Sequence, residues 1–142
     1  MAGHDDVQKL VDLLREAEAE GRVDDELISM LECRGRACIS ATYVKKAKAA
    51  AKNAQTDEEF LDNLAKTVRV LKREGDAVYM MYPECYCHHL KGFEGDVPHS
   101  YCYCSAGWVK EMFEQALGRP VEVKVETTVL RGDEACRLRV LM

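Results

Sequence analysis

The chain has 142 residues, of which 47% are hydrophobic and 32% charged, the ordinary composition of a folded globular protein. Its 25 acidic and 20 basic residues give a net charge of −5, which argues against a nucleic-acid-binding surface. No apolar run reaches the roughly 20 residues of a membrane span, and the acidic N-terminus lacks the apolar core of a secretory signal. We therefore expect a cytoplasmic protein of one domain, residues 1–142, that binds neither nucleic acid nor membrane.

Residues 1–75 are expected to form a helical layer. Apolar residues spaced three and four apart from Val7 to Leu14 predict a first helix, which Gly21 ends. An aspartate at position 24 or 25 can cap a second helix. Gly35 is expected to weaken or break this second helix, since glycine is a poor helix former.

Two further helices are predicted before residue 76. The first covers about residues 37–54, and its lysines are expected on a solvated face. Thr56 and Glu59 form a capping box, in which each side chain satisfies a free backbone donor of the helix start. The helix that they open is expected to end at Gly75 and to bury Phe60, Leu61, Leu64, Val68 and Leu71.

Residues 76–142 change to a pattern of strands around one helix. Alternating or β-branched residues predict strands at 76–87, 97–104, 121–126 and 136–140, and Ser105 can cap a helix over 105–117. Strands joined as hairpins form antiparallel sheets. The sequence therefore predicts an α+β fold, with N-terminal helices packed on a mostly antiparallel four-stranded sheet and one helix between two hairpins.

Seven cysteines stand out in a chain without a secretory signal. Cytosolic thiols are kept reduced, and clustered ones are more often metal ligands or catalytic groups than disulfides. In a strand, side chains two residues apart share a face. If the two strands pair, Cys85 and Cys87 face Cys102 and Cys104, and four sulfurs can bind zinc or an iron–sulfur cluster. His88, His89 and His99 can each replace one sulfur.

The same cysteines allow other interpretations. Cys104 directly precedes the predicted helix start, where the helix dipole favours a thiolate, so it can act as a nucleophile with His88 or another loop histidine as its base. It can equally pack under Trp108, and the Cys-x-Cys pairs can form redox disulfides. Cys136 reads as a core residue, Cys33 and Cys38 flank Gly35 with only a weak indication of a shared site, and the tyrosines can pack or line a pocket.

Two segments resemble known families. The run from Gly132 to Val140, with an acidic residue after the glycine and then Cys136, resembles the closing motif of the 4-vinyl-reductase domain. It also resembles the ending of bacterial proteins described as L-2-amino-thiazoline-4-carboxylic acid hydrolases, and the cysteine pattern is similar to that of an uncharacterised cysteine-rich bacterial family. Leu138 stands where that closing motif has an aromatic residue. The resemblance implies a small-ligand pocket, for which we name Cys136, Tyr103, Trp108 and His99.

Three functions follow as hypotheses. The first is a cytosolic protein that binds a small ligand or a metal through its cysteine-rich site. The second is a cysteine-dependent hydrolase of a small sulfur- or nitrogen-containing heterocycle, and the third is a dithiol redox or metal sensor. No Ser–His–Asp arrangement, phosphate-binding glycine loop or His-Glu-x-x-His helix is present, so the sequence leaves open whether the protein is an enzyme. Exposed hairpin edges are compatible with a homodimer.

Overall fold

The computed structural model describes residues 3–82, 97–128, 130, 133 and 135–142. Its helices and strands follow in the order α1 (Gly3–Ala19), α2 (Asp25–Cys38), α3 (Ala41–Lys52), α4 (Asp57–Ala65), β1 (Leu71–Glu74), β2 (Ala77–Tyr82), the short 3₁₀ helix η2 (His99–Cys102), α5 (Tyr103–Leu117), β3 (Glu122–Thr127) and β4 (Cys136–Leu141). Within these described parts of the chain, no helix combines the length and the apolar character that crossing a bilayer would require.

The four strands form one antiparallel sheet in the order β1-β2-β4-β3. The hairpin β1–β2 precedes α5 in the chain and the hairpin β3–β4 follows it, so the predicted α+β fold with one helix between two hairpins is confirmed. The predicted alternation of β4 is also confirmed, because Cys136, Leu138 and Val140 are all buried. The register pairs Tyr82, at the end of β2, with Cys136, at the start of β4.

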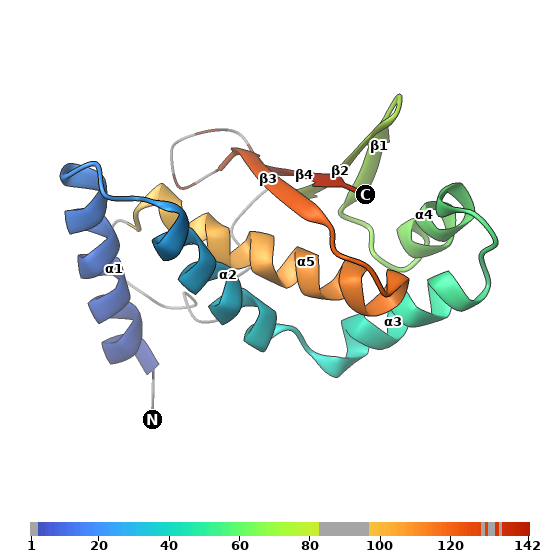
Figure 1. Ribbon diagram of the computed structural model, residues 1–142, viewed down its shortest axis with the longest axis horizontal. Helices are drawn as coiled ribbons and strands as arrows, with labels where there is room; N and C mark the ends of the chain where they lie inside the picture. The colour runs from blue at the N-terminus through green and yellow to red at the C-terminus, as the bar shows by residue number, and fades with distance from the viewer. Residues whose placement is uncertain (1–2, 83–96, 129, 131–132, 134) are drawn as a thin grey trace.

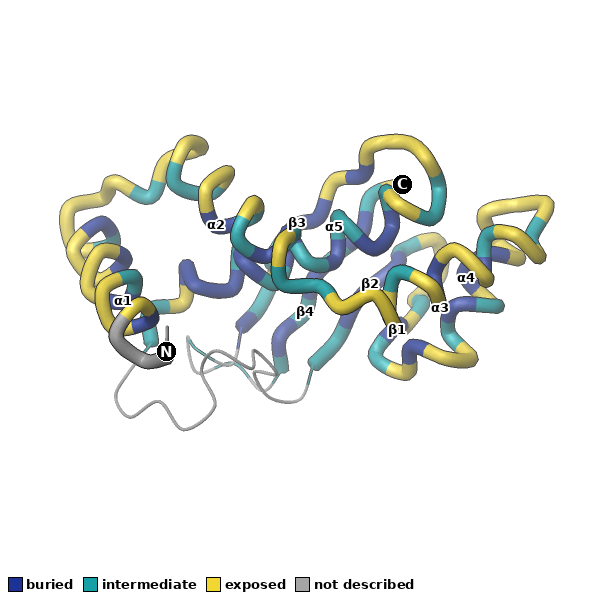
Figure 2. The backbone as a smooth tube through the Cα atoms, turned by 90° about the horizontal axis from the view of Figure 1, so that it is seen from below, coloured by how far each residue is buried: buried dark blue, intermediate teal, exposed yellow. Residues whose placement is uncertain are grey.

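Helix α5 is the centre of the molecule. It lies between the sheet on one side and α2 and α3 on the other (Figure 1). The main core packs one side of α5 and the inner side of the sheet against α3 and α4. Figure 2 shows the buried residues running along α5 and the strands, whereas the outer helices carry most of the exposed positions.

A second, smaller core lies at the N-terminal end of α5. Its buried members are Leu14 of α1, Leu31 of α2, and Tyr101 and Cys104 around the start of α5. Helix α1 stands at the edge of the molecule, beside this end of α5 (Figure 1). The two cores therefore divide the chain into a large body around the sheet and a smaller unit that holds α1.

The predicted capping residues sit where helices begin. The side chain of Asp24 accepts a hydrogen bond from the backbone N–H of Leu27 at the start of α2. Thr56 does the same for Glu59, and the Glu59 carboxylate accepts from the N–H of Gln55. These bonds satisfy donors that a helix start leaves free. Helix α3 begins at Ala41, later than predicted, because the backbone is extended at 39 and 40.

The predicted break at Gly35 is wrong. Helix α2 continues through Gly35 to Cys38. Gly35 is buried against the backbone of α5, where a Cβ atom would stand 1.7 Å from the carbonyl oxygen of Cys104. This glycine lets two helices touch rather than ending one of them.

The predicted end of the fourth helix at Gly75 is also wrong. Helix α4 ends at Ala65, and Leu71 starts strand β1 instead of continuing the helix. Gly75 has a φ of 60° and occupies the two-residue turn between Glu74 and Ala77. A hairpin turn of this length needs a positive φ, which glycine adopts without strain. The boundary between the helical and the strand-rich parts therefore falls before Leu71, not after Gly75.

The strand expected over 97–104 does not exist. Residues 99–102 form η2, and α5 follows directly from Tyr103. The alternation of Tyr and Cys in this segment suggested a strand, but Tyr101 and Cys104 share the smaller core, and residues three apart lie on one face of a helix. Strand β2 confirms the first part of the strand expected over 76–87, and residues 83–87 lie outside the described part of the chain.

Candidate thiol site

Two buried cysteines meet at the hydroxyl group of Thr128. Cys102 Sγ lies 2.7 Å from Thr128 Oγ1, and Cys136 Sγ donates to the same oxygen at 3.8 Å. Cys102 directly precedes α5, Thr128 follows β3, and Cys136 begins β4. All three side chains are at most 5% exposed. The hydroxyl therefore brings together two thiols that are 34 positions apart in the chain.

Tyr82 adds a neutral phenol beside this cluster. Its strand position is opposite Cys136. Burial raises the pKa of Tyr82 well above its ordinary value of 10.0, and the nearby Cys136 raises it further. The phenol consequently stays protonated at neutral pH and adds no negative charge to the two thiols.

Cys104 belongs to a different cluster. Arg34 Nη1 donates to the hydroxyl oxygen of Tyr101 at 2.9 Å and to Cys104 Sγ at 3.8 Å. Residues two positions apart near a helix start point about 200° apart around its axis. Cys102 therefore contacts Thr128 beside the sheet, whereas Cys104 faces Arg34 of α2.

Arg34 is a half-buried cation, and no carboxylate pairs with it within the described residues. Burial acts to lower the pKa of Arg34, but its interactions with Tyr101 and Cys104 outweigh this effect and raise it. The guanidinium stays charged, and a positive charge beside a thiol favours the thiolate form.

His99, a predicted pocket residue, contacts α1 instead of a cysteine in the described interactions. His99 Nδ1 lies 3.1 Å from Glu18 Oε1, and Ser100 Oγ donates to Glu18 Oε2 at 2.6 Å. The histidine and the serine thus meet on one carboxylate, which differs from a catalytic triad, where the histidine stands between the other two. These three residues connect α1 to η2.

The other predicted pocket residues are distributed over the two cores. Trp108 packs its ring edge-on against Tyr43, with ring centroids 5.0 Å apart, and adjoins the main core. Tyr103 packs against the smaller core. Cys136 is in the Thr128 cluster, so the four residues proposed for a ligand pocket do not share one set of described contacts. Cys33 is exposed and Cys38 partly buried on α2.

The shared strand face proposed for Cys102 and Cys104 is wrong, because both residues are helical and contact different partners. Cys85, Cys87, His88 and His89 lie outside the described residues. Among the residues that are described, no three His, Cys, Asp or Glu side chains are grouped so that they could hold a metal ion. The donor set of the Thr128 cluster, two converging thiols, nevertheless has the chemistry that thiophilic metals prefer.

Two residues of these clusters were missed in the sequence. Thr128 is one of two adjacent threonines after a charged strand, and nothing in the sequence marks it as a partner of cysteines. Arg34 lies next to Cys33 in the chain, yet it contacts Cys104, 70 positions away. Both contacts depend on tertiary packing, which local patterns do not report.

Among solved structures, the chain is similar to the phenol-responsive sensory domain of the transcription activator PoxR, crystallised with phenol. The identity is 14%, the TM-score is 0.47, and the match covers 94% of this chain and 72% of that one. These values are too low to carry a ligand or an activity over to this chain. The comparison with curated proteins finds no match.

A family model describes most of the sequence. Residues 12–142 match the model of DUF6144, described as a family of unknown function. The resemblance to the 4-vinyl-reductase domain stays a prediction, since the match is to this other family. Because the matched region leaves out only the first eleven residues, the chain belongs to the DUF6144 family.

Proposed function

We propose that the protein binds a thiophilic metal ion, zinc foremost, at a centre to which Cys102 and Cys136 contribute thiolates. The observation that carries this proposal is the convergence of the two buried thiols on the Thr128 hydroxyl. Zinc binds cysteine thiolates strongly, and a buried site protects such bonds from competing water. The bound ion would supply structural cross-linking or Lewis-acid chemistry at this place.

The remaining ligands are proposed from the chain order. A structural zinc ion takes four ligands, and the Thr128 cluster supplies two thiols. Cys85 and Cys87 follow closely after Tyr82 in the sequence, and Tyr82 pairs opposite Cys136. This proximity in the chain supports Cys85 and Cys87 as the other two ligands. Cys104 is left out of this set because its described contact is to Arg34.

Metal analysis of anaerobically purified protein tests the proposal. We expect about one zinc ion per chain. Cys102→Ser and Cys136→Ser should each lose the metal while keeping the circular dichroism of a folded protein. The control is Cys33→Ser, which changes an exposed cysteine of α2 and should keep the metal.

Two results would refute the proposal. One is the absence of zinc or iron both after purification and after incubation with zinc. The other is unchanged zinc content in both the Cys102 and the Cys136 variants. Absorption distinguishes the metals, because an iron–sulfur cluster is coloured and zinc is not, and cobalt substitution shows sulfur-to-metal bands only if thiolates are ligands.

A second candidate function rests on Cys104. Arg34 donates to its sulfur, and the residue lies in the first turn of α5, where the helix dipole also favours an anion. These two effects support Cys104 as a reactive thiolate, as a cysteine-dependent hydrolase would need. The described contact of His99 with Glu18 leaves the proposed general base without support among the described histidines.

Alkylation separates this second candidate from simple packing. Iodoacetamide should label Cys104 more slowly in Arg34→Gln than in the unaltered protein, whereas Arg34→Lys should keep most of the rate because it keeps the charge. Peptide mass spectrometry identifies the labelled cysteine. Equal labelling of Cys104 in Arg34→Gln and in the unaltered protein would exclude activation by Arg34.

A further inference from the structure

The hydrogen bonds of the Thr128 hydroxyl distinguish its two sulfur neighbours. A hydroxyl group has one proton to donate and two lone pairs that accept. Thr128 Oγ1 accepts from the backbone N–H of Leu130 at 3.1 Å and from the thiol of Cys136 at 3.8 Å. With both lone pairs engaged, its one proton is directed to Cys102 Sγ, 2.7 Å away.

Because the Thr128 hydroxyl donates to Cys102 and accepts from Cys136, the two thiols differ in how well they hold a negative charge. A donated hydrogen bond stabilises negative charge on the sulfur that accepts it. Cys102 is also the N-cap residue of α5, where the helix dipole acts in the same sense. Cys136 instead uses its own proton as a donor and has no comparable stabilisation from Thr128. Cys102 is therefore the better nucleophile of the pair.

We infer that Cys102 and Cys136 form a reversible disulfide when the protein meets a hydroperoxide. Both cysteines are reduced in the structure. Both sulfurs contact Thr128 Oγ1, so the distance between them cannot exceed the sum of the 2.7 Å and 3.8 Å contacts. The sulfurs must approach to about 2.05 Å to bond. Cys102 is oxidised first and Cys136 resolves it.

The atoms balance in two steps. The Cys102 thiolate attacks the O–O bond of the hydroperoxide, so that an S–O bond forms, the O–O bond breaks, and the departing oxygen leaves with the electron pair and takes up a proton. Cys136 loses its proton and attacks the oxidised sulfur, so that the S–S bond forms and water leaves. With hydrogen peroxide, two thiols and one peroxide give one disulfide and two waters.

The disulfide needs no metal, but its consequence for the metal rests on the proposed function. A sulfur in a disulfide is no longer a thiolate ligand. Oxidation should therefore release the zinc ion proposed above, and reduction should restore the site. The two thiols would thus connect metal occupancy to the redox conditions around the protein.

Oxidation of the zinc-free protein tests the disulfide. Dilute, chelator-treated protein is exposed to hydrogen peroxide, the remaining thiols are alkylated, and the peptides are mapped by mass spectrometry. We expect a mass loss of two hydrogen atoms and one cross-linked peptide pair that contains Cys102 and Cys136, reversed by dithiothreitol. The Cys33→Ser variant should form the same cross-link. In Cys136→Ser, Cys102 should be oxidised to the sulfenic acid and form no disulfide with residue 136.

A change at Thr128 tests the order of the two sulfurs. Thr128→Val keeps the shape and removes the hydroxyl that contacts Cys102 Sγ, so oxidation of Cys102 in the Cys136→Ser background should slow about tenfold. Thr128→Ser keeps the hydroxyl and should keep the rate. Equal rates in Thr128→Val and Thr128→Ser would contradict the order in which we place the sulfurs.

The outcomes separate this inference from the proposed function. Zinc binding that depends on both cysteines, without any cross-link after zinc removal, refutes the disulfide and leaves the metal site intact. A cross-link between Cys102 and Cys136 in a protein that never binds zinc supports the disulfide and refutes the metal site. A cross-link of either cysteine with another residue refutes the pairing.

Discussion

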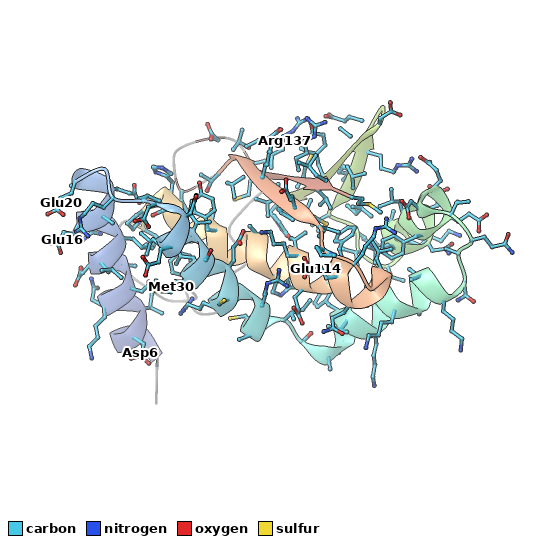
Figure 3. The ribbon with its side chains drawn as sticks, in the orientation of Figure 1. Asp6, Glu16, Glu20, Met30, Glu114 and Arg137 are labelled. Carbon is cyan, nitrogen blue, oxygen red and sulfur yellow. The ribbon has the colours of Figure 1, made fainter. Side chains whose placement is uncertain are left out.

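At the scale of single residues, Glu114 shows how one carboxylate connects three elements. It lies on α5, and Figure 3 labels it close to the start of β3. Glu114 accepts from Arg36 of α2 at 2.8 Å through one oxygen and from the backbone N–H of Val121 at 3.0 Å through the other. The hydrogen bond from Arg36 lowers the pKa of Glu114 below its ordinary value of 4.5, although burial opposes the shift.

This shift predicts a pH dependence of stability. A carboxyl group whose pKa is lower in the folded than in the unfolded protein stabilises the fold. This contribution is complete at a pH above the unfolded pKa of 4.5, and it is lost as the pH falls through the lower pKa of the folded protein. Glu114→Gln should lower the free energy of unfolding by about 1–2 kcal/mol at neutral pH, and the difference should shrink well below pH 4.5. Urea unfolding at both pH values measures it.

An exposed glutamate of the sheet serves as the control. Glu122→Gln on β3 removes a carboxylate that has no ion pair within the described residues, so its effect should be small at either pH. A difference between Glu114→Gln and the unaltered protein that stays constant from neutral to acidic pH would contradict the assignment. The same difference in both variants would indicate general charge repulsion.

The residue scale also shows where the sequence was informative about the site. Cys102 and Cys104 stand out through their Cys-x-Cys spacing, whereas Cys136 reads as a core residue in the sequence. All three are buried, and each contacts a polar side chain. Their partners were not predictable, because Thr128 and Arg34 reach them through packing between distant segments. Cys102 meets Thr128 and Cys104 faces Arg34 because this segment is helical, although its alternating Tyr and Cys residues suggested a strand.

At the scale of elements, two glycines let α2 and α5 approach each other closely. A Cβ atom at Gly107 of α5 would stand 1.9 Å from the carbonyl oxygen of Glu32, and one at Gly35 of α2 would meet Cys104 at 1.7 Å. The contacts are reciprocal, since each glycine faces the backbone of the other helix. Beside them, Lys110 of α5 pairs with Glu32 at 2.8 Å.

Alanine at Gly35 should therefore destabilise strongly. In most helices Gly→Ala stabilises by up to about 1 kcal/mol. Here the added methyl group overlaps a backbone oxygen, which cannot rotate away, so Gly35→Ala and Gly107→Ala should each cost about 3 kcal/mol or more. Thermal and urea unfolding measure the change.

Gly21 provides the comparison for this prediction. It has a φ of 66° and open space around its Cα, so Gly21→Ala carries only backbone strain of about 1–2 kcal/mol. If Gly35→Ala is no worse than Gly21→Ala, the helices can separate at little cost and the close contact does not stabilise the fold.

Elements with complete local signals were predictable, and those decided by tertiary contacts were not. The starts of α2 and α4 follow from Asp24 and Thr56, and the end of α5 follows from Gly118, which has a φ of 70°. Strand β1 reads Leu-Lys-Arg-Glu, a good helix sequence, and becomes a strand because it pairs with β2 across the Gly75 turn. Pairing thus overrides propensity.

At the scale of the whole molecule, α1 is held to the rest of the protein by the smaller core and by Glu18. The carboxylate of Glu18 meets His99 at 3.1 Å and the hydroxyl group of Ser100 at 2.6 Å. Two large apolar residues of this unit are exposed, Leu13 on α1 and Met30 on α2, and Figure 3 labels Met30. Helix α1 therefore buries one face, which includes Leu14, and leaves the opposite face exposed.

Removal of the Glu18 carboxylate should loosen α1 without unfolding the main core. In Glu18→Ala, we expect backbone amides of α1 to exchange with deuterium about tenfold faster, as for a lost charged hydrogen bond of about 1.5 kcal/mol. Amides of α5 should exchange at unchanged rates. Glu16→Ala, at an exposed position of the same helix, is the control and should change neither.

If amide exchange in Glu18→Ala became equally faster in α1 and α5, the two cores would open together. This result would contradict the division into two units. Hydrogen–deuterium exchange followed by mass spectrometry resolves the two helices, because they are far apart in the sequence. An unchanged rate in α1 would mean that the smaller core alone holds it.

The glycine contact also restricts the position of Cys102. Because α2 and α5 meet backbone to backbone at Gly35 and Gly107, the first turn of α5 has no freedom to slide along α2. Cys102 is attached directly to that turn. A displacement of α2 should therefore also move the backbone of Cys102, because the two helices meet main chain to main chain.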